Sequence, residues 1–526
     1  MPNSIYKDKT LILSDGVSLK ARIWSPKGKG PWPALIMRQP YGREIASTVT
    51  YNHPIWFASQ GFLVVIQDVR GQGDSTGNFS GFSQEAFDTS QTLEWVRSLP
   101  ECNGKIGSYG FSYQGLTQLL AIPGTDPPDC LAPAMTGVNE QDHWSCDGGA
   151  FWWDIGISWG LQLAAQKTKR VQDIKGWNEI RTSLENNSYL RDGPELLAKY
   201  DPQGMAFKWL NKSNNCSKNW EIHKPLGTWL RQPILLIGGW WDPHLRGIID
   251  IYHQSLKAGG DPELHIGPAT HLKWWEGSQK LQLEFFKRHL QSHKDITFTS
   301  KKLNLWNLTT KKWQGSKPSI KNDDSYWSLK SSGEACIESK DGTLLAHSEG
   351  GGTVTLVHDP WRPAPSIGGH LGPNSGEADR TFIDNRTDVA TFTSSPLMET
   401  LYLEGSPLLE LEVYSDQKGF DLCTALSVID QEKTQITQLS TGFLRVLGDE
   451  AKKPSRRKIS FFPLVADLKE GTSLRISIAG AAWPAIGINP GNNEHPCAAP
   501  GPNCLVTTIY LKLNGSKLQL SPLFNV

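Results

Sequence analysis

The sequence has no excess of charge of either sign. Its 526 residues include 53 basic and 53 acidic ones, so the formal net charge is zero. Proteins that gather nucleic acid or bind anionic membranes usually carry a strongly basic balance. We therefore expect neither nucleic acid nor a membrane surface as a partner. The expected ligand is a small molecule with little charge of its own.

Long apolar runs are also missing. No stretch approaches the roughly 20 apolar residues that a helix needs to cross a bilayer. The first ten residues, "MPNSIYKDKT", lack the apolar core of a secretory signal. The sequence therefore predicts a cytoplasmic protein, and it leaves open whether copies of the chain associate.

The eight cysteines do not form a metal-binding pattern. They include no C-x-x-C pair and have no companion histidine at zinc spacing, so we expect no metal and mostly reduced, structural thiols. Cys497 and Cys504 bracket "AAPGPN" and would close a small disulfide loop in an oxidising compartment. The glycine-rich stretch "DVRGQGDSTGNF" (68–79) fits no phosphate-binding register, so no organic cofactor is expected either. A structural loop with Arg70 paired to a carboxylate is the stronger interpretation of that stretch.

The first 300 residues alternate short apolar runs with amphipathic segments. "LILSDGVSLKARIW" (11–24) predicts a hairpin turned at Asp15-Gly16, because that dipeptide readily adopts positive φ. Runs such as "GFLVVIQDVRG" and "PILLIGGWWD" are uninterrupted by polar residues, which is typical of parallel strands covered on both faces. "SQEAFDTSQTLEWVRSLP" has helical spacing. This alternation predicts a doubly wound α/β domain.

Two further units are expected. The polar, tryptophan-rich segment 139–230 interrupts the alternation and predicts a helical cap inserted between two parts of the α/β domain, 1–138 and 231–298. From 299 to 526, short alternating runs such as "TVTLVH" and "LRISIAG" are separated by glycine and proline, a pattern that predicts a β-sandwich domain.

One strand-to-helix junction has the features of a nucleophile elbow. In "KIGSYGFSYQG" (105–115), Ser112 follows a predicted strand and precedes the helix-like "LTQLLAI". Gly110 and Gly115 leave room on either side, although Gln114 occupies the place of the second glycine in the usual G-x-S-x-G. The rival Ser108 lies inside the strand. An ordinary glycine-rich turn is the alternative.

An acid and a base follow in the order that such a serine needs. A serine hydroxyl becomes nucleophilic when a histidine accepts its proton, and a carboxylate orients that histidine. Asp242 ends the strand "PILLIGGWWD", and His271 follows the next strand in "HIGPATH". Both therefore lie at the carboxyl-end edge of the predicted sheet. Taken singly, Asp242 could cap a helix and His271 could be structural.

A family resemblance covers almost the whole chain. "RQPYGRE", "DVRGQGDSTGNF", "CNGKIGSYGFSYQG", "GGWWD" and "IGPATH" resemble successive motifs of the cocaine-esterase and X-prolyl dipeptidyl-peptidase family of serine hydrolases, whose elbow is written G-x-S-Y-x-G. The resemblance implies an α/β-hydrolase domain, an inserted helical cap and a C-terminal jelly-roll, galactose-binding-like domain. It also implies an oxyanion hole formed by the Tyr41 hydroxyl and the backbone N–H of Tyr113.

Paired tryptophans lie beside some of these positions. Trp241 precedes Asp242, Trp274 follows His271, and Trp153 lies in the cap segment. Aromatic walls bury much ligand surface, so these three are candidates for an apolar acyl pocket, although core packing is the alternative. We thus expect a serine hydrolase that cleaves an ester, an amide or a short X-Pro peptide. The competing hypothesis is a non-catalytic protein that binds carbohydrate or another small molecule on a hydrolase scaffold.

Overall fold

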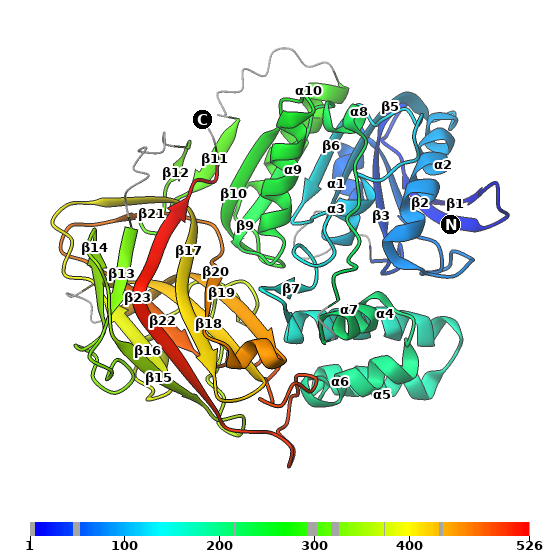
Figure 1. The fold of residues 1–526 in the computed structure, drawn as a ribbon. Helices are drawn as coiled ribbons and strands as arrows, with labels where there is room; N and C mark the ends of the chain where they lie inside the picture. The colour runs from blue at the N-terminus through cyan, green and yellow to red at the C-terminus, as the bar shows by residue number, and fades with distance from the viewer. Residues whose placement is uncertain are drawn as a thin grey trace.

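The chain folds into an α/β domain, a helical cap and a C-terminal β domain (Figure 1). The structure is a computed structural model. It describes residues 6–45, 53–214, 217–291, 302–316, 326–372, 374–430 and 435–524. The expected boundary at 298/299 lies outside these residues.

The α/β domain is built on a ten-stranded sheet. Its order is β1-β2-β4-β3-β5-β6-β9-β10-β11-β12. The strands are β1 (Lys7–Ile12), β2 (Ser18–Trp24), β3 (Trp32–Gln39), β4 (Leu63–Asp68), β5 (Cys102–Phe111), β6 (Cys130–Ala134), β9 (Leu235–Trp241), β10 (Glu263–Thr270), β11 (Leu303–Trp306) and β12 (Trp313–Gln314). The run from β4 through β11 is parallel. The predicted parallel strands and the hairpin at Gly16 (φ 83°) are confirmed.

Helices cover both faces of this sheet, as its buried strands require. One face packs on α1 (Pro54–Ser59) and α10 (Ser278–Leu290). The other packs on α2 (Glu85–Arg97), α3 (Tyr113–Thr117) and α9 (Leu245–Lys257). The 3₁₀ turn η1 (Gly81–Gln84) leads into α2. The carboxyl ends of the parallel strands therefore stay free of these helices and face the cap.

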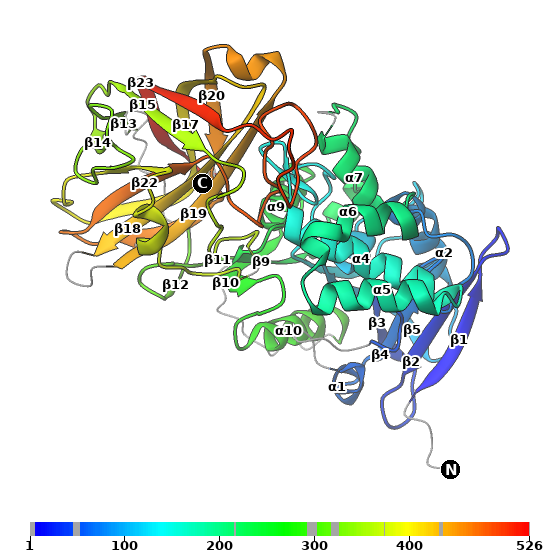
Figure 2. The same ribbon diagram turned by 90° about the horizontal axis from the view of Figure 1, so that it is seen from below.

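The cap is helical, as predicted. It begins with a short hairpin of two-residue strands, β7 (Cys146–Asp147) and β8 (Ala150–Phe151). Four helices follow: α4 (Trp153–Arg170), α5 (Ile174–Glu185), α6 (Tyr189–Tyr200) and α7 (Met205–Asn214). The short helix α8 (Gly227–Leu230) then leads back to the sheet. Figure 2 shows α4–α7 grouped beside both the sheet and the β domain.

The first sheet extends beyond the segment assigned to it from the sequence. β11 pairs in parallel with β10, and β12 pairs with β11. Both strands lie after residue 298, in the segment that the sequence pattern assigned to the β domain. The residue pattern of such short strands does not predict which sheet they join, because the pairing of an edge strand depends on tertiary contacts.

The C-terminal domain is a barrel-like β domain. Its strands form one hydrogen-bonded set of 11. They are β13 (Tyr326–Lys330), β14 (Thr343–Ala346), β15 (Thr353–His358), β16 (Val389–Thr393), β17 (Leu401–Ser415), β18 (Gly419–Asp430), β19 (Gln435–Leu447), β20 (Ser455–Ser460), β21 (Leu464–Leu468), β22 (Ser473–Ala479) and β23 (Thr507–Ser521), with a short helix α11 (Thr381–Asp384) and a 3₁₀ turn η2 (Asp449–Lys452). β17 alternates buried and partly exposed residues, so it covers the core with one face.

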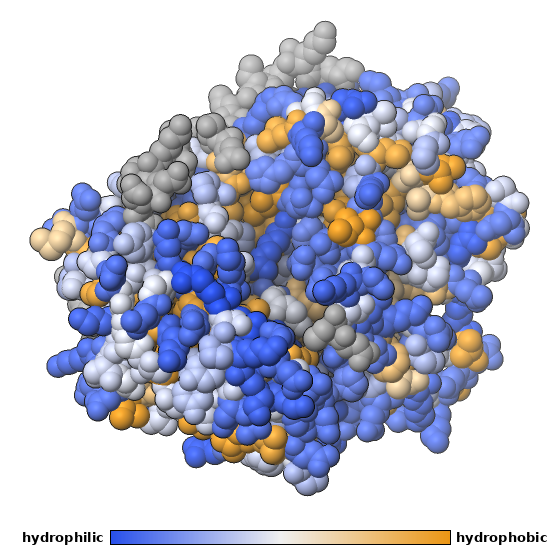
Figure 3. Space-filling model, viewed as in Figure 1, coloured by the Kyte–Doolittle hydropathy of each residue, from blue (hydrophilic) through white to orange (hydrophobic). Residues whose placement is uncertain are grey.

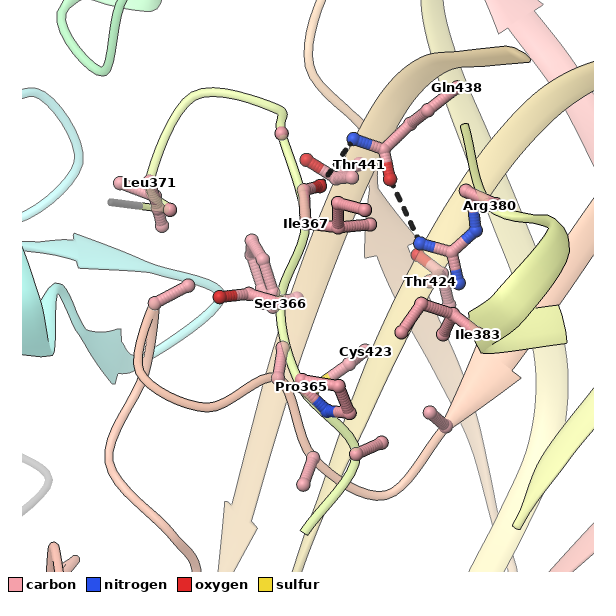
Figure 4. Close-up of a pocket in the computed structure, with 18 residues that line it drawn as sticks. Pro365, Ser366, Ile367, Leu371, Arg380, Ile383, Cys423, Thr424, Gln438 and Thr441 are labelled. Atoms are coloured by element: carbon pink, nitrogen blue, oxygen red, sulfur yellow. Dashed lines mark hydrogen bonds between the residues drawn. The ribbon is translucent and has the colours of Figure 1, made fainter. Parts of the chain in front are cut away.

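A small cavity lies inside the β domain, between residues 364–372 and the strands β18 and β19 (Figure 4). Arg380 donates a hydrogen bond to Gln438 (2.9 Å), whose amide donates to the Ile367 carbonyl (2.9 Å). The cavity volume is about 30 Å³, the space of a single water molecule, whereas ligand pockets measure roughly 300–1,000 Å³. This cavity is therefore too small to hold a sugar or an ester substrate.

A buried ionic cluster joins the three parts. Asp147 of the cap accepts a hydrogen bond from Arg246 of α9 (2.8 Å) and bonds the imidazole of His370 from the β domain (3.1 Å). The His370 ring stacks on Phe462 at 3.4 Å, and the Arg246 guanidinium lies 4.7 Å from the same ring centre. Burial alone would raise the pKa of Asp147, but Arg246 and His370 hold it below its usual value. The ion pair of Asp147 and Arg246 thus joins the cap to α9, and its further partners come from the β domain.

Hydrophilic residues cover most of the face in Figure 3, with apolar residues scattered among them. Within the described residues, no helix combines the length and apolar character needed to cross a membrane. The cysteines of the described segments, Cys497 and Cys504 included, are free thiols.

Candidate active site

Ser112 occupies a strained turn between β5 and α3. Its φ is 59°, in the left-handed region that side chains other than glycine rarely adopt. Its N–H reaches back to the carbonyls of Ala134 (3.0 Å) and Met135 (3.1 Å) at the end of β6, which fixes the turn. A serine held in this way projects from the carboxyl-end edge of the sheet, as a nucleophile elbow requires.

The two glycines of the motif make room for specific neighbours. A Cβ atom at Gly110 would lie 2.4 Å from the Cβ of Gln114, and one at Gly115 would lie 2.8 Å from the Cβ of Thr136. Gly110 also has a φ of 140°. Both glycines are therefore required by close packing around the turn.

Asp242 and His271 are joined directly. The Nδ1 of His271 lies 2.6 Å from Oδ1 of Asp242, which is completely buried at the end of β9. The other carboxylate oxygen, Oδ2, accepts the backbone N–H of His244 (3.1 Å). Because a carboxylate only accepts, Nδ1 of His271 carries the hydrogen and Nε2 keeps a free lone pair. This is the tautomer that a general base needs.

The ring of His271 packs beside the elbow. It lies 5.2 Å from the ring of Phe111, the residue before Ser112, and 4.9 Å from the ring of His244. The structure therefore brings the three triad candidates to one place.

His244 is a neutral neighbour of the triad. Burial lowers its pKa to about 4, and its Nδ1 donates to the carbonyl of His143 (2.6 Å). Its ring also contacts Trp144 (4.5 Å) and Trp152 (5.6 Å). A neutral imidazole here places no like charge against His271 when that residue becomes protonated. The sequence offered no reason to select His244 for this role, because its effect depends on burial.

Tyr41 lies close to the Ser112 side chain. It lies two residues after the end of β3, and its hydroxyl interacts with the Ser112 side chain and accepts a hydrogen bond from Nε1 of Trp159 (3.1 Å). Burial raises the pKa of Tyr41 to about 12, so the phenol stays protonated at neutral pH. Since Trp159 occupies a lone pair of the hydroxyl, the phenolic hydrogen remains available to another acceptor.

Tyr113 supplies a free backbone donor and a buried anchor. As the first residue of α3, it has no intrahelical acceptor for its N–H. Its phenol donates to Glu85 (2.8 Å), whose other oxygen accepts from Arg38 (2.6 Å). Burial raises the pKa of Tyr113 well above its usual value. This chain of contacts holds the first turn of α3 against α2.

Comparisons with known proteins match both parts of the chain. The model of the X-Pro dipeptidyl-peptidase (S15) family matches residues 15–273, and that of the X-Pro dipeptidyl-peptidase C-terminal non-catalytic domain matches residues 297–516. The cocaine esterase of Rhodococcus sp. (strain MB1 Bresler) is 26% identical over 464 residues, which cover 80% of each chain. The chain belongs to the cocaine-esterase and X-Pro dipeptidyl-peptidase family. It is an enzyme, a serine hydrolase, which favours catalysis over the non-catalytic binding hypothesis.

Two solved structures have the same fold. An aminopeptidase from the marine sediment archaeon Thaumarchaeota archaeon is 17% identical with a TM-score of 0.72, and 98% of this chain and 96% of that chain are covered. An α-amino acid ester hydrolase gives the same identity, TM-score and coverage. The predicted α/β-hydrolase domain followed by a β domain is thus confirmed.

The three predicted pocket tryptophans occupy different environments. Nε1 of Trp274 donates to the His271 carbonyl (3.3 Å), and its ring lies 5.8 Å from that of Phe111. Trp241 is partly buried directly before Asp242. Trp153 is buried away from the triad residues, with its Nε1 on the Leu190 carbonyl (2.8 Å) and its ring 6.2 Å from that of Trp483. It packs the cap against the β domain, so the expected pocket role is replaced by a packing role.

An aromatic group from the cap lies on the other side of the site. Trp159 stacks on Trp209 at 5.7 Å, and Trp144 contacts both rings. Nε1 of Trp209 donates to Glu140 (2.8 Å), which also bonds His223 (3.1 Å). The sequence shows that the segment is rich in tryptophan, but positions 144, 159 and 209 have no regular spacing that would single out these three.

Among the residues that the structure describes, two groups of side chains have donor atoms close enough to hold a metal ion. One is Asp242, His244 and His271, and the other is Glu140, Glu221 and His223. Hydrogen bonds account for the close approach of His271 to Asp242 and of His223 to Glu140.

The loop 68–79 is structural. Arg70 pairs with Asp88 (2.7 Å) and Asp15 (2.6 Å), which confirms the predicted pairing with a carboxylate. Asp68, where the loop begins, pairs with Arg43 (2.8 Å), two residues after Tyr41. The loop therefore braces the segment that carries Tyr41.

The buried histidines predict a loss of stability in acid. The pKa values of His244 and His265 are lowered by burial to about 4, against about 6.5 in an unfolded chain. Between those pH values the unfolded state binds protons that the folded state does not, so the free energy of unfolding falls as the pH drops from 6.5 towards 4. We expect a loss on the order of 2–3 kcal/mol for each residue, measured as the urea midpoint at pH 7 and pH 4.5.

The variant His244→Asn is the control for that measurement. It removes one of the titrating groups, so its urea midpoint should fall less between pH 7 and pH 4.5 than that of the unchanged protein. A midpoint that is constant or rises on acidification would contradict the prediction.

Proposed function

We propose that Ser112, His271 and Asp242 form the catalytic triad and that the Tyr41 hydroxyl and the Tyr113 N–H form the oxyanion hole. The enzyme would then cleave an ester or amide through an acyl-enzyme on Ser112. The observation that carries this proposal is the 2.6 Å bond between His271 and a fully buried Asp242, in a site whose serine has positive φ and lies beside the Tyr41 hydroxyl.

In the first half of the reaction, Ser112 attacks the carbonyl carbon. Nε2 of His271 takes the serine proton, and the negative charge of Asp242 stabilises the imidazolium that forms. The carbonyl oxygen gains charge and accepts from the Tyr41 hydroxyl and the Tyr113 N–H. His271 then gives its proton to the leaving alcohol or amine, and the acyl group stays on Ser112.

Water completes the cycle. His271 takes a proton from the water as the water attacks the acyl carbon, and returns it to the Ser112 oxygen as the acid is released. The neutral His244 is consistent with both halves, because it adds no repulsion when His271 carries a charge.

The substrate we propose is a small, uncharged ester or amide with an apolar acyl group. Trp241 at the end of β9, Trp274 in the loop after β10 and Trp159 from the cap offer aromatic surface near the triad, and aromatic surface favours apolar groups. Pro243 and Leu245 stand beside His244 directly after Asp242, so that turn contributes no further carboxylate to hold a substrate ammonium. The named relatives act on cocaine, X-Pro peptides, aminopeptidase substrates and α-amino acid esters.

Labelling with a fluorophosphonate tests the nucleophile. This reagent phosphonylates activated serines, and we expect one adduct per chain, located by peptide mass spectrometry on the peptide that contains Ser112. Denatured protein serves as the control and should not react, because the triad geometry is lost. An adduct on another serine, or no adduct on folded protein, would overturn the assignment.

A panel of substrates then distinguishes the bond types. p-Nitrophenyl esters of increasing acyl size, amino-acid arylamides and X-Pro arylamides should be compared by kcat/KM. We expect uncharged apolar esters to be preferred; a preference for substrates with a free α-ammonium would contradict the substrate class while leaving the triad intact.

A further inference from the structure

The two proposed oxyanion donors come from separate segments of chain. Tyr41 follows β3, and Tyr113 begins the helix after β5. The pairing between β3 and β5 ends at Ile36 and Ser108, several residues before either donor. Beyond that point the sheet itself does not fix the distance between the donors.

Two buried glutamines bridge this gap. Nε2 of Gln114 donates to Oε1 of Gln39 at 3.2 Å, and the exposed fractions of the two side chains are 1% and 0%. Oε1 of Gln114 accepts the backbone N–H of Phe111 (3.3 Å), just before Ser112. One end of the bridge is therefore attached to the elbow.

The other end is attached to the Tyr41 loop. Nε2 of Gln39 donates to the carbonyls of Gly42 (3.0 Å) and Ile45 (3.1 Å), which follow Tyr41. The hydrogen bonds form a chain with a single direction of donation. The Phe111 N–H donates to Gln114, Gln114 donates to Gln39, and Gln39 donates to these carbonyls. Each amide acts as donor and acceptor together, which neither a carboxylate nor an apolar side chain can do.

The elbow also makes space for this side chain. The missing Cβ at Gly110, 2.4 Å from the Cβ of Gln114, is what allows Gln114 to fold back towards β3. The residue that breaks the usual G-x-S-x-G spelling is thus the one that reaches the neighbouring strand.

We propose that Gln114 and Gln39 are positioning residues that hold the Tyr41 hydroxyl and the Tyr113 N–H at the separation required by the oxyanion. This inference rests on the proposed catalytic site. Small displacements of a preorganised donor reduce its contribution to the transition state more than they reduce substrate binding. The bridge should therefore affect kcat and leave KM nearly unchanged.

A double-mutant cycle tests the inference with a p-nitrophenyl ester. Gln114→Met keeps the side-chain volume and removes both hydrogen bonds, and we expect kcat to fall about tenfold or more, with KM within about threefold, as a part of the roughly 10²–10³ that one oxyanion donor supplies. In a Tyr41→Phe background, where one donor is already absent, the same substitution should lower kcat by less than about threefold.

Gln39→Met breaks the same bridge from the other side and should reproduce the kcat loss. Thermal unfolding monitored by tryptophan fluorescence will show whether each variant is folded. If Gln114→Met does not fold, Gln39→Met provides the test instead. A purely structural role would lower kcat equally in both backgrounds, and this additive outcome would overturn the inference, as would an unchanged kcat.

Failure of the catalytic proposal has a different signature. If Tyr41 is not an oxyanion donor, Tyr41→Phe alone leaves kcat unchanged, and the bridge loses its function with it. If Tyr41→Phe lowers kcat but the glutamine substitutions act additively, only the positioning role is wrong.

Discussion

Ser112→Ala is expected to lower kcat on a p-nitrophenyl ester by roughly 10⁴-fold or more. The substitution removes the attacking oxygen, and the oxyanion donors and binding surface then support only slow attack by water. KM should change little, because the hydroxyl makes a small contribution to substrate binding. Alanine also fits the space, since it is smaller than serine, although it keeps the strained φ of 59°.

Ser108→Ala is the matched control. Ser108 lies four residues earlier, inside β5, where its hydroxyl donates to Gln118 (3.2 Å) and does not reach the turn. Its substitution should leave kcat within a few fold while costing about 1 kcal/mol of stability. If Ser112→Ala keeps comparable turnover, or if Ser108→Ala shows the large loss instead, the nucleophile is assigned incorrectly.

Asp242→Asn should also reduce kcat by about 10⁴-fold, for a reason that the local hydrogen bonds make specific. Oδ2 of Asp242 accepts the backbone N–H of His244. An asparagine must keep its oxygen at that position, so its NH₂ group faces His271. The imidazole then accepts at Nδ1 and carries its hydrogen on Nε2, where it cannot take the proton of Ser112.

The control for Asp242→Asn is Asp147→Asn, another buried carboxylate. Asp147 bonds Arg246 and His370 in the interdomain cluster, away from the reacting atoms. Its substitution should lower the unfolding temperature while kcat stays within about tenfold. A loss of less than tenfold in Asp242→Asn, measured on protein with an unchanged circular dichroism spectrum, would contradict the proposed role of Asp242.

Much of the α/β domain follows from local patterns. Continuous apolar runs predict β4 and β9, and the Asp15-Gly16 turn predicts the first hairpin, because these signals depend only on neighbours along the chain. The triad candidates could also be found, since Ser112, Asp242 and His271 each end a strand at one sheet edge. Edge strands carry no such signal, so the pairing of β11 and β12 with the first sheet could not be predicted from their own residues.

The residues that the sequence did not reveal act through tertiary contacts. Trp159 supports Tyr41 from the cap, a contact between positions far apart in the chain. Trp153 was grouped with the pocket by its place in a pair, yet its partner in that pair, Trp152, is the one that contacts His244. Successive residues at the start of a helix point in different directions, so composition alone cannot tell which of the two faces the site.

The cluster of Asp147, Arg246 and His370 links the C-terminal domain to the first turn of α9. Arg246 lies in the first turn of α9, four residues after Asp242, and its other neighbours are the Ser460 carbonyl and the Phe462 ring of the β domain. Without that domain, Asp147 and Arg246 would keep only their hydrogen bond to each other among these contacts. The β domain therefore supports the first turn of α9, and we expect a chain that lacks this domain to unfold at a lower temperature than the whole chain.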